Sequence, residues 1–356
     1  MTHGFAFAER ALMRGERVAP ERLDSLRGWY PVAATGDQVG WRWLGGKRFS
    51  EPFFSDTLAD QPRQSRLVCQ TPYAALAQFD DVLAPSAFIF HVSRCGSTLL
   101  TQSLAALAHC VVLSEPPVLD AFLRERGQGG LDAAGLAVFR QLVGALGQRR
   151  GPGESAFVIK FDSWHIASLA AVRRAFPDTP CIFLYREPDA VLASHRRRRG
   201  PQMVPGMIDP ARLGIDGGAR APGDLDAYCI AVLEQFYTAA LAQAGAAGLM
   251  LLNYNELPGA VPALLARLGI ACSAQEGAAI RARAAYHSKD AGLPFGGDPD
   301  GAPMHGGATL AAAYARLEQM RLEQMRLEQM RLEQMRLSAQ ATTKPQPSHN
   351  QAITKP

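Results

Sequence analysis

Residues 91–100, HVSRCGSTLL, combine the residue types that bind phosphate in a short loop. They follow the apolar run SAFIF and lead into Leu-Leu, which predicts a strand, a tight turn and the start of a helix. The N–H groups at a helix N-terminus bind anions with the help of the helix dipole. Gly96 allows close approach to the backbone, and Ser97 and Thr98 add hydroxyl donors. The loop therefore predicts a phosphate site.

The loop lacks the lysine that marks nucleoside triphosphate sites. Those loops read GxxxxGK[ST], with Lys on the β- and γ-phosphates and Ser or Thr on magnesium. Here Gly96 directly precedes Ser97, and Arg94 supplies a cation from the other side of the loop. The pattern suits a single phosphate group, and we expect no metal.

A second pair with anion-binding chemistry lies in CIFLYREPDAVLASHRRR. Arg186 ends the apolar run and offers a forked donor that matches phosphate geometry. Ser194 follows two turns into the helix that Pro188 opens, so it can approach the same anion. The spacing alone is a weak signal, and it gains weight only beside the loop at 93–98.

Two more charged residues end apolar runs: Glu115 ends CVVLSE, and Lys160 lies near the end of FVIKF. Taken singly, each could be a capping residue or an ion-pair partner. Together with Arg94 and Arg186, however, they follow consecutive strands of an expected parallel sheet. Open α/β sheets bind ligands at the carboxyl edge of their strands. We therefore expect these residues to meet at one site.

SRCGSTLL resembles the 5′-phosphosulfate loop of the sulfotransferase family, which commonly reads close to RSGSTLL. The family also has an Arg at a later strand end and a Ser eight residues on, like Arg186 and Ser194. The resemblance covers residues 85–295, with Cys95 standing where the family has a small hydroxyl residue or glycine. It implies a P-loop NTPase-like sulfotransferase fold, a three-layer α/β/α arrangement around a central parallel sheet.

The resemblance also implies a donor, 3′-phosphoadenosine 5′-phosphosulfate, whose sulfuryl group passes to a hydroxyl or amine acceptor. By this likeness Glu115 is the acceptor's base, while Lys160 and Arg94 stabilise the charge of the transferred and leaving groups. His165 and His195 remain alternative bases. The implied donor-binding residues are Ser93, Arg94, Cys95, Gly96, Ser97, Thr98, Arg186, Ser194 and, from HSKDAGLPF, Lys289. The acceptor, a small molecule, glycan or peptide, is not encoded readably.

Two other functions stay open. A P-loop kinase with Lys160 in place of the loop lysine would bind ATP with magnesium, but the sequence shows no clear Walker-B carboxylate. A non-catalytic nucleotide-binding or scaffold protein would bind the donor without transferring its sulfuryl group. The kinase predicts magnesium-dependent ATP binding, and the non-catalytic protein predicts tolerance of Glu115→Gln and Lys160→Ala.

The elements that must position these residues alternate between strands and helices. Apolar runs predict strands at AFIFHV, CVVLSE, FVIKF, CIFLYR and LMLLNY, and helical patterns lie between them. Such alternation predicts an α/β domain over residues 85–300 with a parallel sheet covered on both faces. Residues 1–84 form an N-terminal α+β extension, with a helix over 5–15 and a hairpin within VGWRWLGGKRF. The linker at 200–223 is long enough to be a lid.

The C-terminal region repeats RLEQM four times from Arg316 to Met335. Five residues turn a helix by roughly 140°, so Leu and Met wander around it instead of forming one stripe. Residues 301–340 are expected to form this repeat helix, as a spacer or as a surface for self-association. Residues 341–356 are expected to be a disordered tail.

Composition is that of an ordinary globular protein, with 47% hydrophobic and 20% charged residues among 356. The net charge of +4 predicts no nucleic-acid partner; the Arg196–Arg199 run either attracts an anionic acceptor or is a solvated helix face. Six scattered cysteines form no CxxC pair. No window approaches 18 uninterrupted apolar residues, and charges interrupt the apolar stretch of the N-terminus, so we expect no membrane span, no signal peptide and a cytoplasmic protein.

Overall fold

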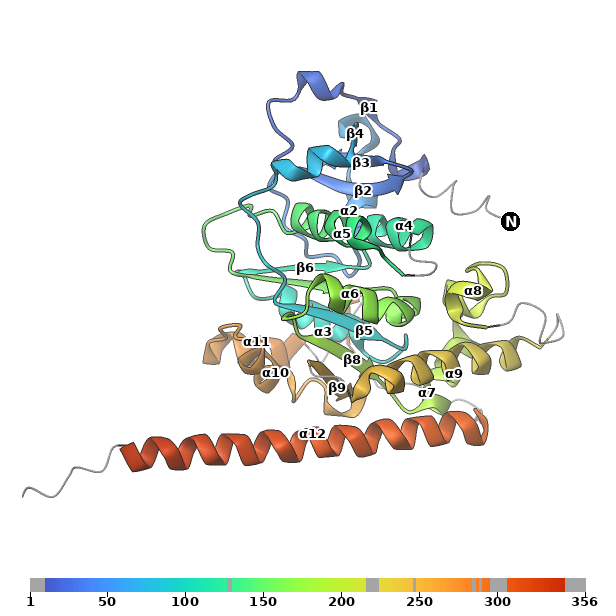
Figure 1. Ribbon diagram of the computed structural model, residues 1–356, viewed down its shortest axis with the longest axis vertical. Coiled ribbons are helices and arrows are strands. Elements are labelled where there is room, and N and C mark those ends of the chain that lie inside the picture. The colour runs from blue at the N-terminus through green and yellow to red at the C-terminus, as the bar shows by residue number, and fades with distance from the viewer. Residues whose placement is uncertain are drawn as a thin grey trace, which may run out of the picture.

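The computed structural model describes residues 10–126, 130–215, 224–245, 248–283, 286–287, 290–294 and 306–342. A parallel sheet forms the centre of the molecule, and a mixed sheet belongs to the N-terminal region (Figure 1). A short antiparallel pair joins β10 (Tyr286–His287) and β11 (Asp290–Pro294). Residues 5–9 of the expected helix over 5–15, part of the linker at 200–223, and the tail from 343 lie outside the described residues.

The central sheet has five parallel strands in the order β6-β7-β5-β8-β9. Every residue of these strands is buried. Because alternate residues point to opposite faces, both faces of the sheet are covered. This confirms the predicted α/β class with a central parallel sheet. The strands are β5 (Ala87–His91), β6 (Cys110–Ser114), β7 (Ala156–Lys160), β8 (Cys181–Tyr185) and β9 (Leu249–Asn253).

The strand order places the loop at 92–96, the predicted phosphate site, in the middle of the sheet. The first of these strands along the chain, β5, lies between β7 and β8, so the connection from β5 to β6 passes β7. The connection from β7 to β8 then passes β5 on its way to the other half. Ligands of doubly wound sheets bind where the strand order reverses in this way.

Helices fill the connections, as the alternation predicts. Helix α4 was not predicted, because the Pro-Pro pair and the charged end of PPVLDAFLRER conceal it, and the short helices α2, α8 and α11 were not predicted either. Pro117 is the first residue of α4, where proline costs no hydrogen bond. The helices are α3 (Ser97–Ala105), α4 (Pro117–Arg126), α5 (Ala133–Leu146), α6 (Leu169–Ala175), α7 (Pro188–Arg197), α8 (Pro210–Leu213), α9 (Leu225–Ala244), α10 (Val261–Arg267) and α11 (Ala274–Arg283). Short 3₁₀ turns that bear on the site are η4 (Ser163–Ser168), η5 (Pro201–Met203) and η6 (Tyr254–Glu256).

The N-terminal sheet runs in the order β1-β4-β3-β2 and packs through β2 on α4 and α5 (Figure 1). Its hairpin lies earlier than the sequence predicted: the strand at 38–43 pairs with 29–35, and not with residues 44–49. A two-residue turn begins at Gly36, whose φ of 61° suits a tight hairpin. The elements are β1 (Glu16–Arg17), β2 (Trp29–Thr35), β3 (Gln38–Trp43), α2 (Phe54–Asp60) and β4 (Leu67–Pro72).

The RLEQM repeats belong to one long helix, α12 (Gly307–Thr342), at the end of the molecule opposite the N-terminal sheet (Figure 1). Its first part packs on α9 and β9. Leu317 is fully buried there, whereas Leu332, further along the helix, is 57% exposed. The repeats therefore share one helix but occupy two environments.

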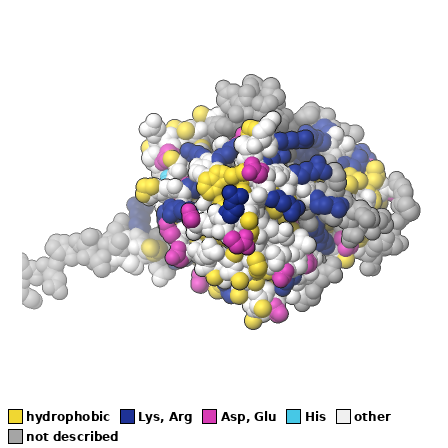
Figure 2. Space-filling view, turned by 90° about the horizontal axis from the view of Figure 1, so that it is seen from above, with side chains coloured by type: hydrophobic (Ala, Val, Ile, Leu, Met, Phe, Trp, Pro, Cys, Tyr) yellow, Lys and Arg dark blue, Asp and Glu magenta, His cyan; other side chains and the backbone are white. Residues whose placement is uncertain are grey.

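Within the described ranges, no helix has both the length and the hydropathy needed to cross a bilayer. Figure 2 looks down on the end of the molecule that carries the N-terminal sheet. Lys and Arg side chains on this face are interspersed with Asp and Glu, so they do not form one uninterrupted basic surface.

Candidate functional site

The loop between β5 and α3 has an unusual backbone. Ser93 and Arg94 have positive φ angles of 69° and 50°, and Gly96 has 79°. Each such conformation costs a non-glycine residue about 1–3 kcal/mol, and these conformations are concentrated in ligand-binding segments. Because Gly96 is the N-cap residue of α3, no capping side chain covers the first N–H groups of the helix. Ser97 and Thr98 occupy this first turn and are buried.

Three side chains hold the loop in this shape. The N–H of Ser93 donates to Nδ1 of His91 at 2.9 Å, and the Arg94 guanidinium donates to the carbonyl oxygen of Arg198. The thiol of Cys95 is fully buried and donates to the carbonyl oxygen of Leu184 at 3.3 Å. Burial raises the pKa of Cys95 to about 12. The Cys95 side chain therefore anchors the loop to β8, and only its backbone can contact a ligand.

Gly96 is required by its neighbour as well as by its φ angle. A Cβ atom at this position would lie 2.7 Å from Cδ2 of Tyr254. The Tyr254 ring also lies 4.3 Å from Cζ of Arg186, a cation–π contact. The sequence placed Tyr254 in the expected strand LMLLNY and gave it no part in the site; its only signal is its place directly after the β9 strand.

Arg186 joins this group from the end of β8. Its NH1 donates to the carbonyl oxygen of Arg94 at 3.4 Å, and its own carbonyl accepts from the Tyr237 hydroxyl. The structure thus brings Arg94 and Arg186 to the same loop. Ser194 lies half-buried in α7, the helix expected to carry it, and Lys289 lies outside the described residues.

The Arg196–Arg199 run mainly holds elements together. Arg196 and Arg199 both bind the Asp226 carboxylate of α9, the latter at 3.1 Å. The backbone carbonyl of Arg198 accepts a hydrogen bond from the Arg94 guanidinium. This run therefore ties α7 to α9 and to the phosphate loop.

A second group lies at the carboxyl ends of β6 and β7. Lys160 Nζ is 2.9 Å from Oε1 of Glu115, and the Glu115 N–H donates to the Lys160 carbonyl at 2.7 Å. Lys160 is fully buried, while the Glu115 side chain is 24% exposed. Glu115 also has a positive φ of 56°, a second strained residue at this edge. The predicted meeting of these two side chains is thus an ion pair.

His91 connects this ion pair to the phosphate loop. Because its Nδ1 accepts from Ser93, its Nε2 carries the proton and donates to the Phe161 carbonyl at 3.1 Å. The same Nε2 lies 3.6 Å from Oε1 of Glu115. Burial lowers the pKa of His91, so the ring is neutral. Burial raises the pKa of Glu115, but Lys160 and His91 outweigh this and hold it well below its usual range.

The N-terminal region contributes Phe53 to the same place. Lys160 Nζ lies 4.5 Å from the centroid of the Phe53 ring, which stands just before α2. A ring face attracts a cation most strongly when both are desolvated. The extension therefore forms one wall of the Lys160 environment, which no local sequence signal indicated.

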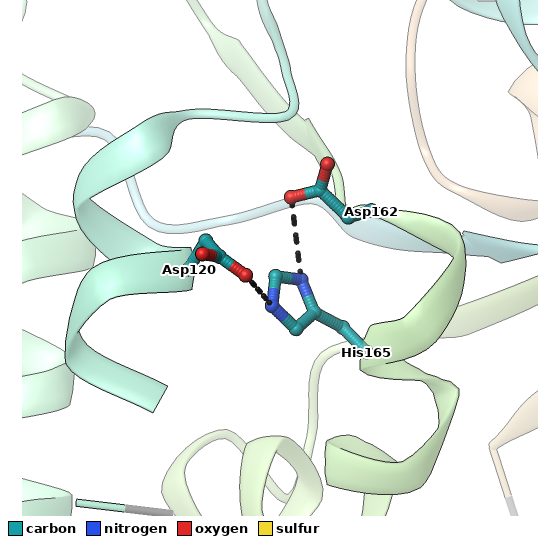
Figure 3. A group of neighbouring side chains, drawn as sticks. All are labelled: Asp120, Asp162 and His165. Atoms are coloured by element: carbon teal, nitrogen blue, oxygen red, sulfur yellow. Dashed lines mark hydrogen bonds and ion pairs between the residues drawn. The ribbon is translucent and has the colours of Figure 1, made fainter. Parts of the chain in front are cut away.

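A buried polar network adjoins this ion pair (Figure 3). Asp120 of α4 accepts hydrogen bonds at Oδ1 from Trp164 Nε1 at 2.8 Å, from His165 Nε2 at 3.0 Å, and from Arg212 of α8. On the other side of its ring, His165 Nδ1 faces Oδ2 of Asp162 at 3.6 Å. His165 is thus a buried link between two carboxylates and does not face open solvent.

The two carboxylates of this network hold protons differently. Burial raises the pKa of Asp120, but His165 and Arg212 outweigh it, so the pKa falls and Asp120 stays ionised. The pKa of Asp162 is raised well above its usual range by burial and by the charges of Glu115 and Asp120. Asp162 therefore keeps its proton to a higher pH than an ordinary carboxyl group.

The three side chains Asp120, Asp162 and His165 offer ligand atoms within 4.8 Å of one another, as a metal site would. The nearest oxygen of Asp120, however, already accepts from three donors, and one of them is the Arg212 guanidinium. A cation here would face that positive charge. The group fits a proton-carrying network better than a metal centre.

No protein-family model matches this chain, and no curated protein matches it. Solved structures similar to it include sulfotransferases. STF1 from Mycobacterium tuberculosis has 14% identity and a TM-score of 0.37, covering 60% of this chain and 75% of that one. STF9 from Mycobacterium avium has 13% identity and a TM-score of 0.38, covering 56% and 67%. A sulfotransferase from Alicyclobacillus acidocaldarius has 17% identity and a TM-score of 0.34, covering 56% and 91%. These structures are sulfotransferases, the family that the motifs resemble. Because the identities and TM-scores are low, the residues of the site are assigned from the contacts within this chain alone.

Proposed function

We propose that this protein is a sulfotransferase that moves a sulfuryl group from 3′-phosphoadenosine 5′-phosphosulfate to a hydroxyl or amine acceptor. The observation that carries the proposal is the Glu115–Lys160 pair, linked by His91 to a lysine-free phosphate loop. The donor, when bound, supplies the activated sulfuryl group. The residues of the chain bind it, orient it and handle charge and one proton.

The donor end suits the N-terminus of α3. The N–H groups of its first turn, the Ser97 and Thr98 hydroxyls and the helix dipole favour one phosphate group. Arg94 and Arg186 add fixed positive charge at the same loop. Ser194, half-buried in α7, is the further donor-binding residue expected near Arg186. A triphosphate with magnesium would lack the loop lysine that usually holds it.

At the acceptor end, Lys160 stabilises negative charge and Glu115 takes the acceptor's proton. In the donor-free protein each neutralises the other, so the low pKa of Glu115 makes it a weak base. When the Lys160 ammonium turns to an anionic group, its pull on Glu115 weakens and Glu115 becomes more basic. Donor binding would thereby prepare the base.

Glu115 is a better base than the histidines considered from sequence. His165 donates from Nε2 to Asp120 and is buried between two carboxylates. His195 is fully buried in α7, where its Nδ1 accepts from the Gly200 N–H at 3.4 Å. Glu115, in contrast, is partly exposed and lies beside Lys160.

The proposal is tested by incubating the protein with sulfur-35-labelled donor and a panel of phenols, alcohols, amines, glycans and peptides. We expect label transfer without added metal, and stabilisation of the fold by adenosine 3′,5′-bisphosphate at low salt. Stabilisation by ATP with magnesium alone would favour the kinase alternative. Donor binding without transfer to any acceptor would favour a non-catalytic role. No stabilisation at millimolar bisphosphate would overturn the site assignment.

A further inference from the structure

The RLEQM units of α12 have the same sequence but different surroundings. The first two units span residues 316–325, and the last two span 326–335. Side chains of the first two reach into the ends of β8 and β9, whereas Arg331, Glu333 and Gln334 of the fourth unit are exposed. The chain thus contains its own matched comparison between docked and undocked copies of one pentapeptide.

Glu318 of the first unit ties two neighbouring strand ends together. The Tyr185 hydroxyl donates to its Oε1, and Asn253 Nδ2 donates to the same oxygen at 2.9 Å. Tyr185 and Asn253 are paired residues at the ends of β8 and β9. Burial raises the pKa of Glu318, but Arg321 and these two donors outweigh it, so Glu318 is ionised.

Arg321, the first residue of the second unit, extends this contact. Its NH2 lies 2.9 Å from Oε2 of Glu318, and its NH1 lies 2.9 Å from Oε1 of Glu256. Glu256 in turn accepts from the Asn253 N–H at 2.8 Å and closes the turn η6. The Arg321 guanidinium therefore bridges two carboxylates, that of Glu256 in the turn and that of Glu318 in α12.

Gln324 of the second unit replaces a missing strand neighbour. Its side chain accepts from the Leu251 N–H at 3.1 Å and donates to the Leu249 carbonyl at 2.9 Å. These backbone groups belong to β9, the last strand of the sheet. An unpaired sheet edge exposes backbone donors and acceptors, and here a side-chain amide satisfies one of each.

The strand ends held in this way lead directly into the donor site. Tyr185 precedes Arg186, and Asn253 precedes Tyr254. The Tyr254 ring packs over the Arg186 guanidinium and fills the space beside Gly96 of the phosphate loop. A continuous set of contacts therefore runs from the repeat helix to the loop.

We propose that Glu318, Arg321 and Gln324 are positioning residues that hold Arg186 and Tyr254 for the donor, while units three and four are not needed for this. The role in donor binding rests on the proposed function. Residues outside the repeat select which units dock: Leu310 is fully buried, and Tyr314 accepts from Asn253 Nδ2 at 3.1 Å. Sliding the helix by one unit would rotate it by about 140° and shift it by about 7.5 Å, which breaks both contacts.

The test compares Glu318→Gln with Glu333→Gln, and Arg321→Gln with Arg331→Gln. Each pair makes the same change in the same local sequence. We expect the first member of each pair to weaken adenosine 3′,5′-bisphosphate binding about 3- to 10-fold and to raise the donor KM with a smaller change in kcat. The second members should stay within twofold of the unchanged protein. Arg321→Lys should restore part of the affinity.

Hydrogen exchange supplies a readout that does not depend on activity. The segments 184–187 and 252–256 should exchange faster in Glu318→Gln and Arg321→Gln than in the fourth-unit variants. Tyr185→Phe, which removes a single hydroxyl, serves if Glu318→Gln fails to fold. Equal exchange and equal affinity in docked and undocked variants would overturn the proposal. Absence of bisphosphate binding in the unchanged protein would instead overturn the proposed function. The hydrogen-exchange rates of segments 184–187 and 252–256 would still test whether the docked units hold Arg186 and Tyr254 in place.

Discussion

Lys160 Nζ lies 2.9 Å from Oε1 of Glu115, and the two side chains differ in their access to water: Lys160 is fully buried and Glu115 is 24% exposed. A buried charge that loses its partner is costly because it has no water to replace it. The partly exposed carboxylate pays less for the same loss. The pair is therefore asymmetric, and its two members should respond differently to substitution.

Glu115→Gln should lower the free energy of unfolding by about 3–5 kcal/mol, because it strands the buried ammonium. Lys160→Met should cost less, and the double variant should recover part of the loss. Glu115→Gln should also lower the transfer rate by about 10²–10⁴-fold while bisphosphate affinity persists. Urea unfolding and initial rates measure the two effects. A larger stability loss in Lys160→Met would contradict the burial of the ammonium.

The stability contributed by the Glu115 carboxylate should disappear in acid. Because its folded pKa lies below the usual value, this contribution is present above the unfolded pKa, about 4.3, and is lost as pH falls through the folded pKa. The Glu115→Gln variant lacks this carboxylate, and so lacks its contribution to stability, at every pH. The difference in melting temperature between the two proteins should therefore shrink between about pH 4.5 and the acid limit. A constant difference would show that Glu115 ionises normally.

Asp120 and Asp162 should respond oppositely to amide substitution. Asp120→Asn removes the charge that holds His165 and Arg212, so it should cost about 3 kcal/mol or more. Asp162 has a raised pKa, so its stabilising effect is present below the usual carboxyl range and lost as pH rises through the folded value. Asp162→Asn should be tolerated and should gain relative stability as pH rises. Melting curves from pH 5 to pH 9 check both.

Gly96→Ala should damage the phosphate loop more than Gly36→Ala damages the hairpin. Both glycines have positive φ, which costs alanine about 1–2 kcal/mol. Only at Gly96 would the added Cβ meet a ring, at 2.7 Å from Tyr254, whereas Gly36 faces open space. Gly96→Ala should therefore lower the free energy of unfolding by about 1–3 kcal/mol more than Gly36→Ala does, and it should abolish bisphosphate binding. Tyr254→Ala in the same chain should relieve part of this additional loss.

Cys95 should resist alkylation in the folded protein. It is fully buried, and its pKa is raised to about 12, so almost no thiolate forms near neutral pH. Cys272, half-exposed at the surface, is the internal control. Mass spectrometry after brief iodoacetamide treatment should find label on Cys272 only. Label on Cys95 at a comparable rate would mean that its thiol faces the loop's open side.

Local sequence patterns were enough to predict the core strands and the strand, turn and helix around residues 91–100. Strands buried on both faces read as continuous apolar runs, and a turn rich in Gly, Ser and Thr before a helix has its own signature. The strand ends also placed Arg94, Glu115, Lys160 and Arg186 at one edge, because parallel strands share a direction. Helix α4 escaped because its Pro-Pro start hides the apolar pattern.

The tertiary structure alone decided which of these residues touch. The Glu115–Lys160 pair depends on β6 and β7 being neighbours, and Phe53 and Tyr254 arrive from segments far away along the chain. Cys95 has a role because β8 offers it a carbonyl. The repeats show the limit most clearly, because identical RLEQM units either contact the sheet or stay exposed, depending on which elements lie beside them. A sequence encodes local conformation through neighbours in the chain, but packing partners are set by the whole fold.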